Sequence, residues 1–126
     1  MGIRDRVVRQ FRKPSGPFGH IVGWIMAVRS SNRERSGWTV DLLHIDPDDR
    51  VLELGCGPGV ALEQVAHRLL SGIVLGIDHS PVMVKQAARR NREAIAAGRV
   101  LVRAGTIEDV RAADGPFTKI FSVNVI

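Results

Sequence analysis

At 126 residues, the chain is long enough for one domain with a modest hydrophobic core and too short for two. Its 44% hydrophobic and 25% charged residues exclude a disordered polymer and are typical of a globular protein. The single cysteine, Cys56, excludes an internal disulfide and a cysteine-based zinc site, and it fits a reducing compartment, so we expect a cytoplasmic protein.

The net charge of +5 is concentrated near the start of the chain. Residues 1–40 carry eight arginine and lysine residues against two acidic residues, so the remainder is close to neutral. Such a basic arm attracts anionic partners. Its charges are not interleaved with aromatic residues as in a surface that stacks on bases. We therefore interpret it as a solvated arm and do not expect nucleic-acid binding.

Residues 1–50 are predicted to form a basic arm followed by a helical extension. Residues 18–26 place apolar side chains along one stripe of a helix, and this run is too short to cross a bilayer. Residues 29–37 are polar and are expected to form a link or a helix end before a second short helix over residues 38–45. The side chains expected to face inward there are Trp38, Val40, Leu42 and Leu43. A turn at residues 46–49 leads into the next element.

The most informative stretch is Val51–Gly59, which reads VLELGCGPG. An apolar strand is followed by alternate glycines, which let the backbone turn tightly and let a ligand approach main-chain atoms. A second strand is predicted over Ile73–Asp78. An acid at the end of that strand, here Asp78, is placed to accept hydrogen bonds from the hydroxyls of a ribose. A sharp loop without a ligand is the simpler alternative for the glycines taken alone.

The remaining elements follow in alternation. A helix is predicted from Val60 to about Ser71–Gly72, with glycine in the stopping position and His67 and Arg68 in its last turn. Ser80 is expected to cap a helix that starts at Pro81. Its inward face is predicted to hold Val82, Met83, Ala87 and Ile95. Two further strands are expected over residues 100–102 and 119–126.

The spacing of the glycines bears on the kind of nucleotide. A dinucleotide-binding fingerprint requires glycine or alanine at the third small position, which counted from Gly55 is occupied by Val60. This weakens the interpretation as an NAD(P)-binding oxidoreductase domain, which is kept as an alternative.

The pattern Glu53-x-Gly55-x-Gly57-x-Gly59 resembles the glycine loop of class I S-adenosylmethionine-dependent methyltransferases of the small-molecule type. The segment Gly76–Met83 is similar to a second motif of that family, G-x-D-x-S-x-x-M. The resemblance implies an α/β Rossmann-like three-layer sandwich around a mainly parallel sheet of seven strands in the order 3-2-1-4-5-7-6. Helices before the glycine loop are often part of a lid in that family.

The resemblance also implies a set of cofactor-binding residues. Glu53 and Asn124 would serve the methionine end, Asp78 the ribose, and His79 and its neighbours in space the adenine. Thr106 stands where the family usually has an acid, so one hydroxyl would replace a carboxylate there. The complete expected set is Glu53, Gly55, Cys56, Gly57, Gly59, Asp78, His79, Met83, Thr106, Ile107 and Asn124.

The expected reaction is in-line displacement of a methyl group from the sulfonium of S-adenosylmethionine to a small-molecule acceptor. It depends mainly on positioning, so neither a catalytic nucleophile nor a metal is expected. Only the first four strands of the family sheet are found, so residues 51–126 are interpreted as a partial methyltransferase domain behind the extension 1–50. A bare fourth strand is an edge that favours self-association. A non-catalytic fragment that binds the cofactor is a further alternative.

Overall fold

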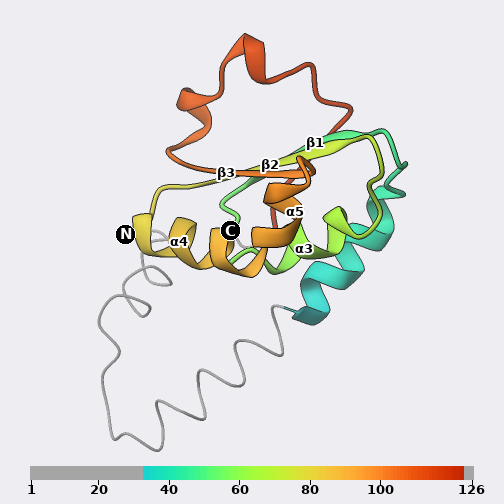
Figure 1. Ribbon diagram of the computed structural model, residues 1–126, viewed down its shortest axis with the longest axis horizontal. Helices are drawn as coiled ribbons and strands as arrows, with labels where there is room; N and C mark the ends of the chain where they lie inside the picture. Colours follow the sequence, from blue (N-terminus) through green and yellow to red (C-terminus); the bar gives the residue numbers. More distant parts are fainter. Residues whose placement is uncertain (1–32, 124–126) are drawn as a thin grey trace, which may run out of the picture.

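The computed structural model describes residues 33–123, which form four parallel strands and their accompanying helices. The strands lie in the order β3-β2-β1-β4 (Figure 1). Their bounds are β1 Arg50–Leu54, β2 Ile73–Asp78, β3 Val100–Ala104 and β4 Lys119–Phe121. The expected α/β class and the order of the first four strands are therefore confirmed.

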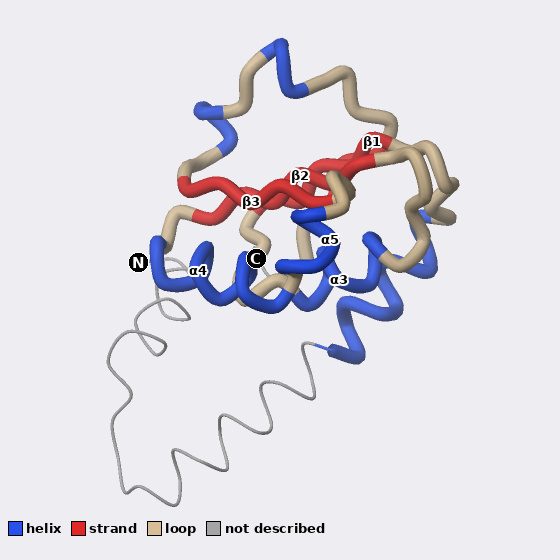
Figure 2. The backbone as a smooth tube through the Cα atoms, in the orientation of Figure 1, coloured by secondary structure: helices blue, strands red, loops and turns tan. Residues whose placement is uncertain are grey.

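The α-helices lie on one face of this sheet. α3 (Val60–Ala66), α4 (Pro81–Arg90) and α5 (Arg92–Ala96) run beneath the strands in Figures 1 and 2. Helical residues 33–43 lie beside α3. Arg68, which follows α3, forms an ion pair with Asp41 of that neighbouring helical segment. The strands and helices together make two layers within the described part of the chain.

Each face of the sheet has its own hydrophobic cluster, because successive residues of a strand point to opposite faces. On the helix-covered face, Val51 and Val74 are fully buried together with Leu62 and Val65 of α3. The cluster on the other face is smaller. It contains Leu52, Leu75 and Ile77, with Leu54, Val110 and Phe117 packed against them.

Residues 105–118 cover this second face with an irregular segment containing η1 (Ile107–Asp109) and η2 (Ala112–Asp114) (Figure 1). Arg103 of β3 anchors it by donating from both terminal nitrogens to the Asp114 carboxylate, at 3.1 and 2.6 Å. These hydrogen bonds lower the pKa of Asp114 to about 2. The segment is therefore tied to the sheet by charge as well as by its apolar side chains.

A polar network closes the amino ends of β1 and β4. Lys119 donates to Oδ2 of Asp49 at 2.6 Å, and the Thr118 hydroxyl donates to Oδ1 at 2.8 Å. The backbone amide of Asp46 adds a hydrogen bond to Oδ2 at 2.7 Å. Burial opposes ionisation of Asp49, but these hydrogen bonds and the Lys119 charge outweigh it and lower its pKa. The expected turn at residues 46–49 is thus confirmed and held by its own carboxylate.

Three expectations for the extension were wrong. The second helix already includes residues 33–37, ahead of its expected start at residue 38. Trp38 is 68% exposed rather than buried, and Leu42 does not face inward. The inward stripe of this helix is Ser36, Val40 and Leu43, at i, i+4 and i+7. Trp38 and Leu42 fall on its other side, and Leu42 is exposed too.

The predicted end of α3 was also wrong. The helix stops at Ala66, so His67 and Arg68 follow it instead of occupying its last turn. Gly72 does not cap it. The amide of Gly72 donates to Pro47 O at 3.0 Å, and a Cβ on Gly72 would lie only 2.2 Å from Asp49 O. Glycine is needed there because the backbone passes so close to the turn before β1.

The helix that starts at Pro81 is confirmed, and the Ser80 hydroxyl caps it by accepting from Met83 N at 3.3 Å. It is shorter than expected, because α4 ends at Arg90 and Ile95 belongs to α5. Val82, expected to face inward, is exposed. The buried position on this helix is Ala87.

Several predictions fall on residues outside 33–123: the basic arm, the helix over residues 18–26 and the role of Asn124. None of the helices described is long and apolar enough to span a membrane. Within the described residues, β4 pairs with β1 alone and forms one edge of the sheet. Self-association through that edge stays a prediction.

Candidate functional site

The glycine loop crosses the carboxyl end of β2. The backbone amides of Gly55 and Cys56 both donate to Ile77 O, at 2.8 and 3.0 Å. Gly55 and Gly57 have φ angles of 68° and 55°, which side-chain-bearing residues rarely adopt. The loop is therefore anchored to β2 by backbone hydrogen bonds, and its shape depends on these two glycines.

Asp78 connects the glycine loop to the start of α4. Its Oδ2 accepts from Gly57 N and its Oδ1 accepts from Ser80 N, both at 2.9 Å. The residue is 7% exposed, and Nδ1 of His79 lies 3.7 Å from Oδ1. Its backbone oxygen accepts from Gly105 N at 2.9 Å, which brings the end of β3 to the same place. Each carboxylate oxygen still has acceptor capacity for a ligand hydroxyl.

Glu53 is the most unusual group of the site. It is 1% exposed within β1, and its Oε1 has no hydrogen-bond partner among residues 33–123. Burial, and then the negative charge of Asp78, raise the pKa of Glu53 well above its usual range. A buried acid without a partner is costly, so native proteins usually provide a donor or a positive charge for it. No described residue donates to Oε1, and a ligand is the natural candidate.

Cys56 lies between these acids and is 2% exposed. Burial, followed by the negative charges of Glu53 and Asp78, raises the pKa of its thiol. The thiol therefore stays protonated at neutral pH and is a poor nucleophile.

Gly59 has a structural function that the sequence did not indicate. Its φ is 87°, and a Cβ would lie 2.7 Å from Nδ2 of Asn91 and 2.9 Å from Cα of Ala87. Asn91 Nδ2 donates to Gly59 O at 3.1 Å and to Ala87 O at 3.0 Å. Asn91 was missed because only the folded chain shows that it joins the glycine loop to the end of α4.

The other expected site residues lie at the margins of this group. Met83 is half-buried in the first turn of α4, and Ile107 is exposed in η1. The Thr106 hydroxyl accepts from Glu108 N at 3.3 Å and lies 3.5 Å from Asp109 Oδ2, so it already caps η1. Its contact with adenine stays a prediction.

The structure thus brings together most of the expected residues at the carboxyl ends of β1 and β2. Parallel α/β sheets commonly bind ligands at this edge. The residues that meet there are Glu53, Gly55, Cys56, Gly57, Asp78 and His79.

Comparisons with known proteins point to one family. Residues 51–126 match the family described as a methyltransferase domain. YdaC of Bacillus subtilis, described as an uncharacterized methyltransferase, is 36% identical over 104 residues, covering 82% of this chain and 54% of YdaC. The crystal structure of YcgJ from Bacillus subtilis has a TM-score of 0.60 at 22% identity and covers 71% of this chain and 37% of that one.

A second solved structure is an RNA methyltransferase from Salinibacter ruber in complex with S-adenosyl-L-homocysteine. It has a TM-score of 0.58 at 24% identity and covers 69% of this chain and 55% of that one. At these identities the two structures support the fold alone. The chain spans about half the length of the curated relatives it matches, 47% and 54% of the first two.

Proposed function

Because this chain belongs to the methyltransferase domain family over residues 51–126, we propose that the protein binds S-adenosylmethionine and transfers its methyl group to a small-molecule acceptor. The observation that carries the proposal is Glu53, a buried carboxylate whose Oε1 has no partner beside the glycine loop. The family description and that of YdaC favour methyl transfer over the oxidoreductase alternative. The Salinibacter ruber structure holds the demethylated form of the same cofactor.

The described residues fit this cofactor in charge and in shape. Its methionine end carries an ammonium group and its sulfur is a cation, so both suit an acidic site. The unpartnered Oε1 of Glu53 can accept a hydrogen bond, and Asp78 retains acceptor capacity for ribose hydroxyls. Gly55 and Gly57 lack the side chains that would crowd a ligand over the loop.

In the proposed arrangement, Glu53 and Asn124 serve the methionine end and Asp78 serves the ribose. His79, Met83 and Ile107 lie on the adenine side, where Thr106 supplies a hydroxyl. Gly59 acts indirectly, because its contact with Asn91 fixes where the loop enters α3. These assignments extend the family resemblance residue by residue.

Methyl transfer requires little from the protein beyond the positioning of the two reactants. S-adenosylmethionine supplies a methyl group on a positively charged sulfur, which is already a good leaving group. The chain's residues would then act by holding the reactants in line. Asp78 would have the central positioning role, because its two carboxylate oxygens fix the glycine loop at Gly57 and the start of α4 at Ser80.

Titration calorimetry tests the proposal. We expect S-adenosylmethionine to bind the full chain and NADH to give no heat. The variant Asp78→Ala should weaken S-adenosylmethionine binding by about 1.5–3 kcal/mol, because it removes charge-assisted hydrogen bonds to the ribose. Circular dichroism of the variant reports whether the fold survives the loss of the two amide contacts.

The matched control is Asp48→Ala, which removes an exposed acid at the opposite end of the sheet. It should leave the affinity unchanged. NADH binding without S-adenosylmethionine binding would contradict the proposal and favour an oxidoreductase domain. A folded Asp78→Ala protein with unaltered affinity would reject the assignment of Asp78. Binding without formation of S-adenosylhomocysteine over a panel of small-molecule acceptors would favour a non-catalytic fragment.

A further inference from the structure

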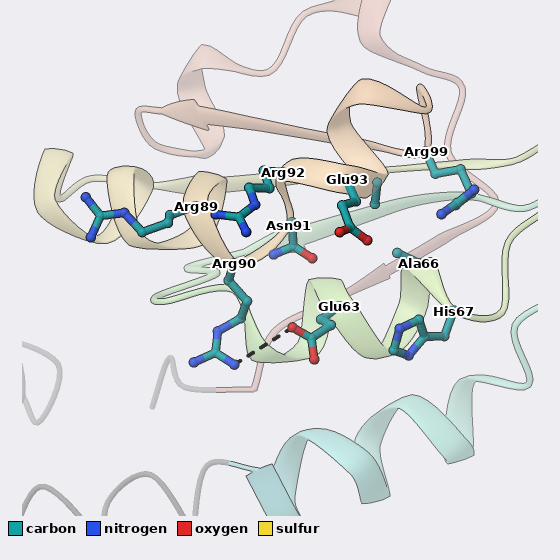
Figure 3. Close-up of a pocket in the computed structure, with 10 residues that line it drawn as sticks. Glu63, Ala66, His67, Arg89, Arg90, Asn91, Arg92, Glu93 and Arg99 are labelled. Carbon is teal, nitrogen blue, oxygen red and sulfur yellow. Dashed lines mark ion pairs between the residues drawn. The ribbon is translucent and has the colours of Figure 1, made fainter.

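A cavity of about 380 Å³ opens in the helical layer, between α3, α4 and α5. Figure 3 shows Asn91, Arg92 and Glu93 along one side of it, and Glu63 of α3 and His67, which follows α3, along the other. The glycine loop 55–59 does not contribute to its lining. The cavity is therefore distinct from the site proposed for S-adenosylmethionine, and a ligand bound in it would not require that function.

The lining of the cavity carries an excess of positive charge, with four arginines and two glutamates. Arg90 is the only one of these arginines in an ion pair among residues 33–123, with Glu63 at 3.8 Å (Figure 3). The Nε atom of Arg99 is buried and has no hydrogen-bond partner in the described part of the chain. Guanidinium groups bind phosphate through paired hydrogen bonds, so this lining suits an anionic ligand.

Asn91 places a second, independent requirement on any ligand of this cavity. It is 3% exposed, and its Nδ2 donates to two backbone oxygens, those of Gly59 and Ala87. These contacts set the orientation of the amide, which leaves Oδ1 as a buried acceptor. Oδ1 has no donor among the described residues. A ligand that satisfies it must carry a hydrogen-bond donor such as a hydroxyl group.

We propose that this cavity binds a small phosphate ester that bears free hydroxyl groups, such as a sugar phosphate. The phosphate pairs with Arg99, the other arginines of the lining add positive charge, and a hydroxyl donates to Asn91 Oδ1. The volume is within the range of small-molecule sites. The lining has no phenylalanine, tyrosine or tryptophan side chain on which a nucleic-acid base could stack, which disfavours single-stranded RNA.

Calorimetry with ribose 5-phosphate, inorganic phosphate and ribose tests this proposal on the full chain at physiological ionic strength. Ribose 5-phosphate should bind, inorganic phosphate should bind roughly tenfold more weakly because Asn91 stays unsatisfied, and ribose should not bind measurably. In ¹⁵N NMR spectra, ribose 5-phosphate should shift the side-chain amide signals of Asn91. No binding of ribose 5-phosphate at millimolar concentration would overturn the proposal.

Variants separate a site from general charge attraction. Arg99→Gln should weaken binding of ribose 5-phosphate at least about tenfold, because it removes the guanidinium that would hold the phosphate. Arg92→Gln, which removes another positive charge of the lining, should also weaken binding, and it replaces the Arg99 variant if that variant does not fold. Lys85→Gln, which removes an exposed charge of α4 outside the lining, should have almost no effect. Equal weakening by the Lys85 variant would refute the proposal. Binding of an RNA oligonucleotide that depends on Arg99 and is tighter than binding of ribose 5-phosphate would refute it too.

Discussion

The two ends of the sheet each contain a buried carboxylate, and the chain treats them differently. At the amino ends, Asp49 is 5% exposed and receives hydrogen bonds from Lys119, Thr118 and the Asp46 amide. At the carboxyl ends, Glu53 is 1% exposed and its Oε1 receives none. The chain therefore satisfies one acid internally, which is typical of structure. Among the described residues it provides no donor for Oε1 of the other acid, which we propose is met by the ligand.

The same contrast has opposite consequences for stability against pH. The pKa of Asp49 is lowered, so its stabilisation is present above the unfolded pKa near 3.8 and is lost as pH falls through the folded pKa. The pKa of Glu53 is raised by burial and by Asp78. Its folded form keeps a proton that the unfolded chain releases near pH 4.5, so Glu53 makes the protein less stable as pH rises above that value.

The largest effect on stability is expected at the amino ends of the strands. Gly72→Ala would place a Cβ 2.2 Å from Asp49 O, and backbone atoms cannot move aside as a flexible side chain can. We expect the free energy of unfolding to fall by about 3 kcal/mol, measured by urea denaturation. The matched control is Gly37→Ala, in the helix over residues 33–43. Its new Cβ would have Nε2 of Gln64, at 3.7 Å, as its nearest neighbour. It should instead raise stability by about 0.5–1 kcal/mol.

A smaller effect is expected from Glu53→Gln, which replaces the ionisable carboxyl group at the carboxyl end of the sheet by an amide of the same shape. Affinity for S-adenosylmethionine should fall by about 1.5 kcal/mol, roughly tenfold, because a hydrogen bond to a charged group is lost. Relative to the parent chain, the variant should also gain stability between pH 5 and pH 8. The reason is that its unfolded chain has no Glu53 carboxyl group whose ionisation favours unfolding. Calorimetry and thermal unfolding at the two pH values measure these effects. Unchanged affinity together with an unchanged pH profile would contradict a ligand role for Glu53.

The smallest effect is expected from Asp49→Asn, in acid alone. The parent chain should lose stability as pH falls below about 4, when Asp49 takes up a proton and its contact with Lys119 weakens. The variant should lose less stability over the same interval. Unfolding curves between pH 2.5 and 6 measure this, and an identical slope in both proteins would show that Asp49 does not contribute to acid unfolding.

Features set by local patterns were predictable from the sequence. The strands β1 and β2, the glycine loop between them and the Ser80 cap follow from hydrophobic runs and from residues with strong conformational preferences. The placement of Glu53 and Asp78 at the strand ends then followed from the parallel topology.

Features set by tertiary contacts were not predictable. Trp38 is exposed because the stripe through Val40 faces the core, which the short window 38–45 did not reveal. Gly72 is explained by a backbone contact with Asp49, a residue 23 positions earlier in the chain. Asn91 separates α4 from α5 while bonding to Gly59 O, a contact between distant residues that no periodicity indicates. Local preference was overridden in each case by packing.

The most direct test of the contrast between the two ends is an NMR titration of the ¹⁵N-labelled chain with S-adenosylmethionine. The backbone amide signals of Gly55, Gly57, Asp78 and His79 should shift, and those of Asp49 and Lys119 should stay in place. Absent shifts at saturating cofactor, or shifts centred on Asp49 and Lys119, would contradict the assignment of the carboxyl ends of β1 and β2 as the cofactor site.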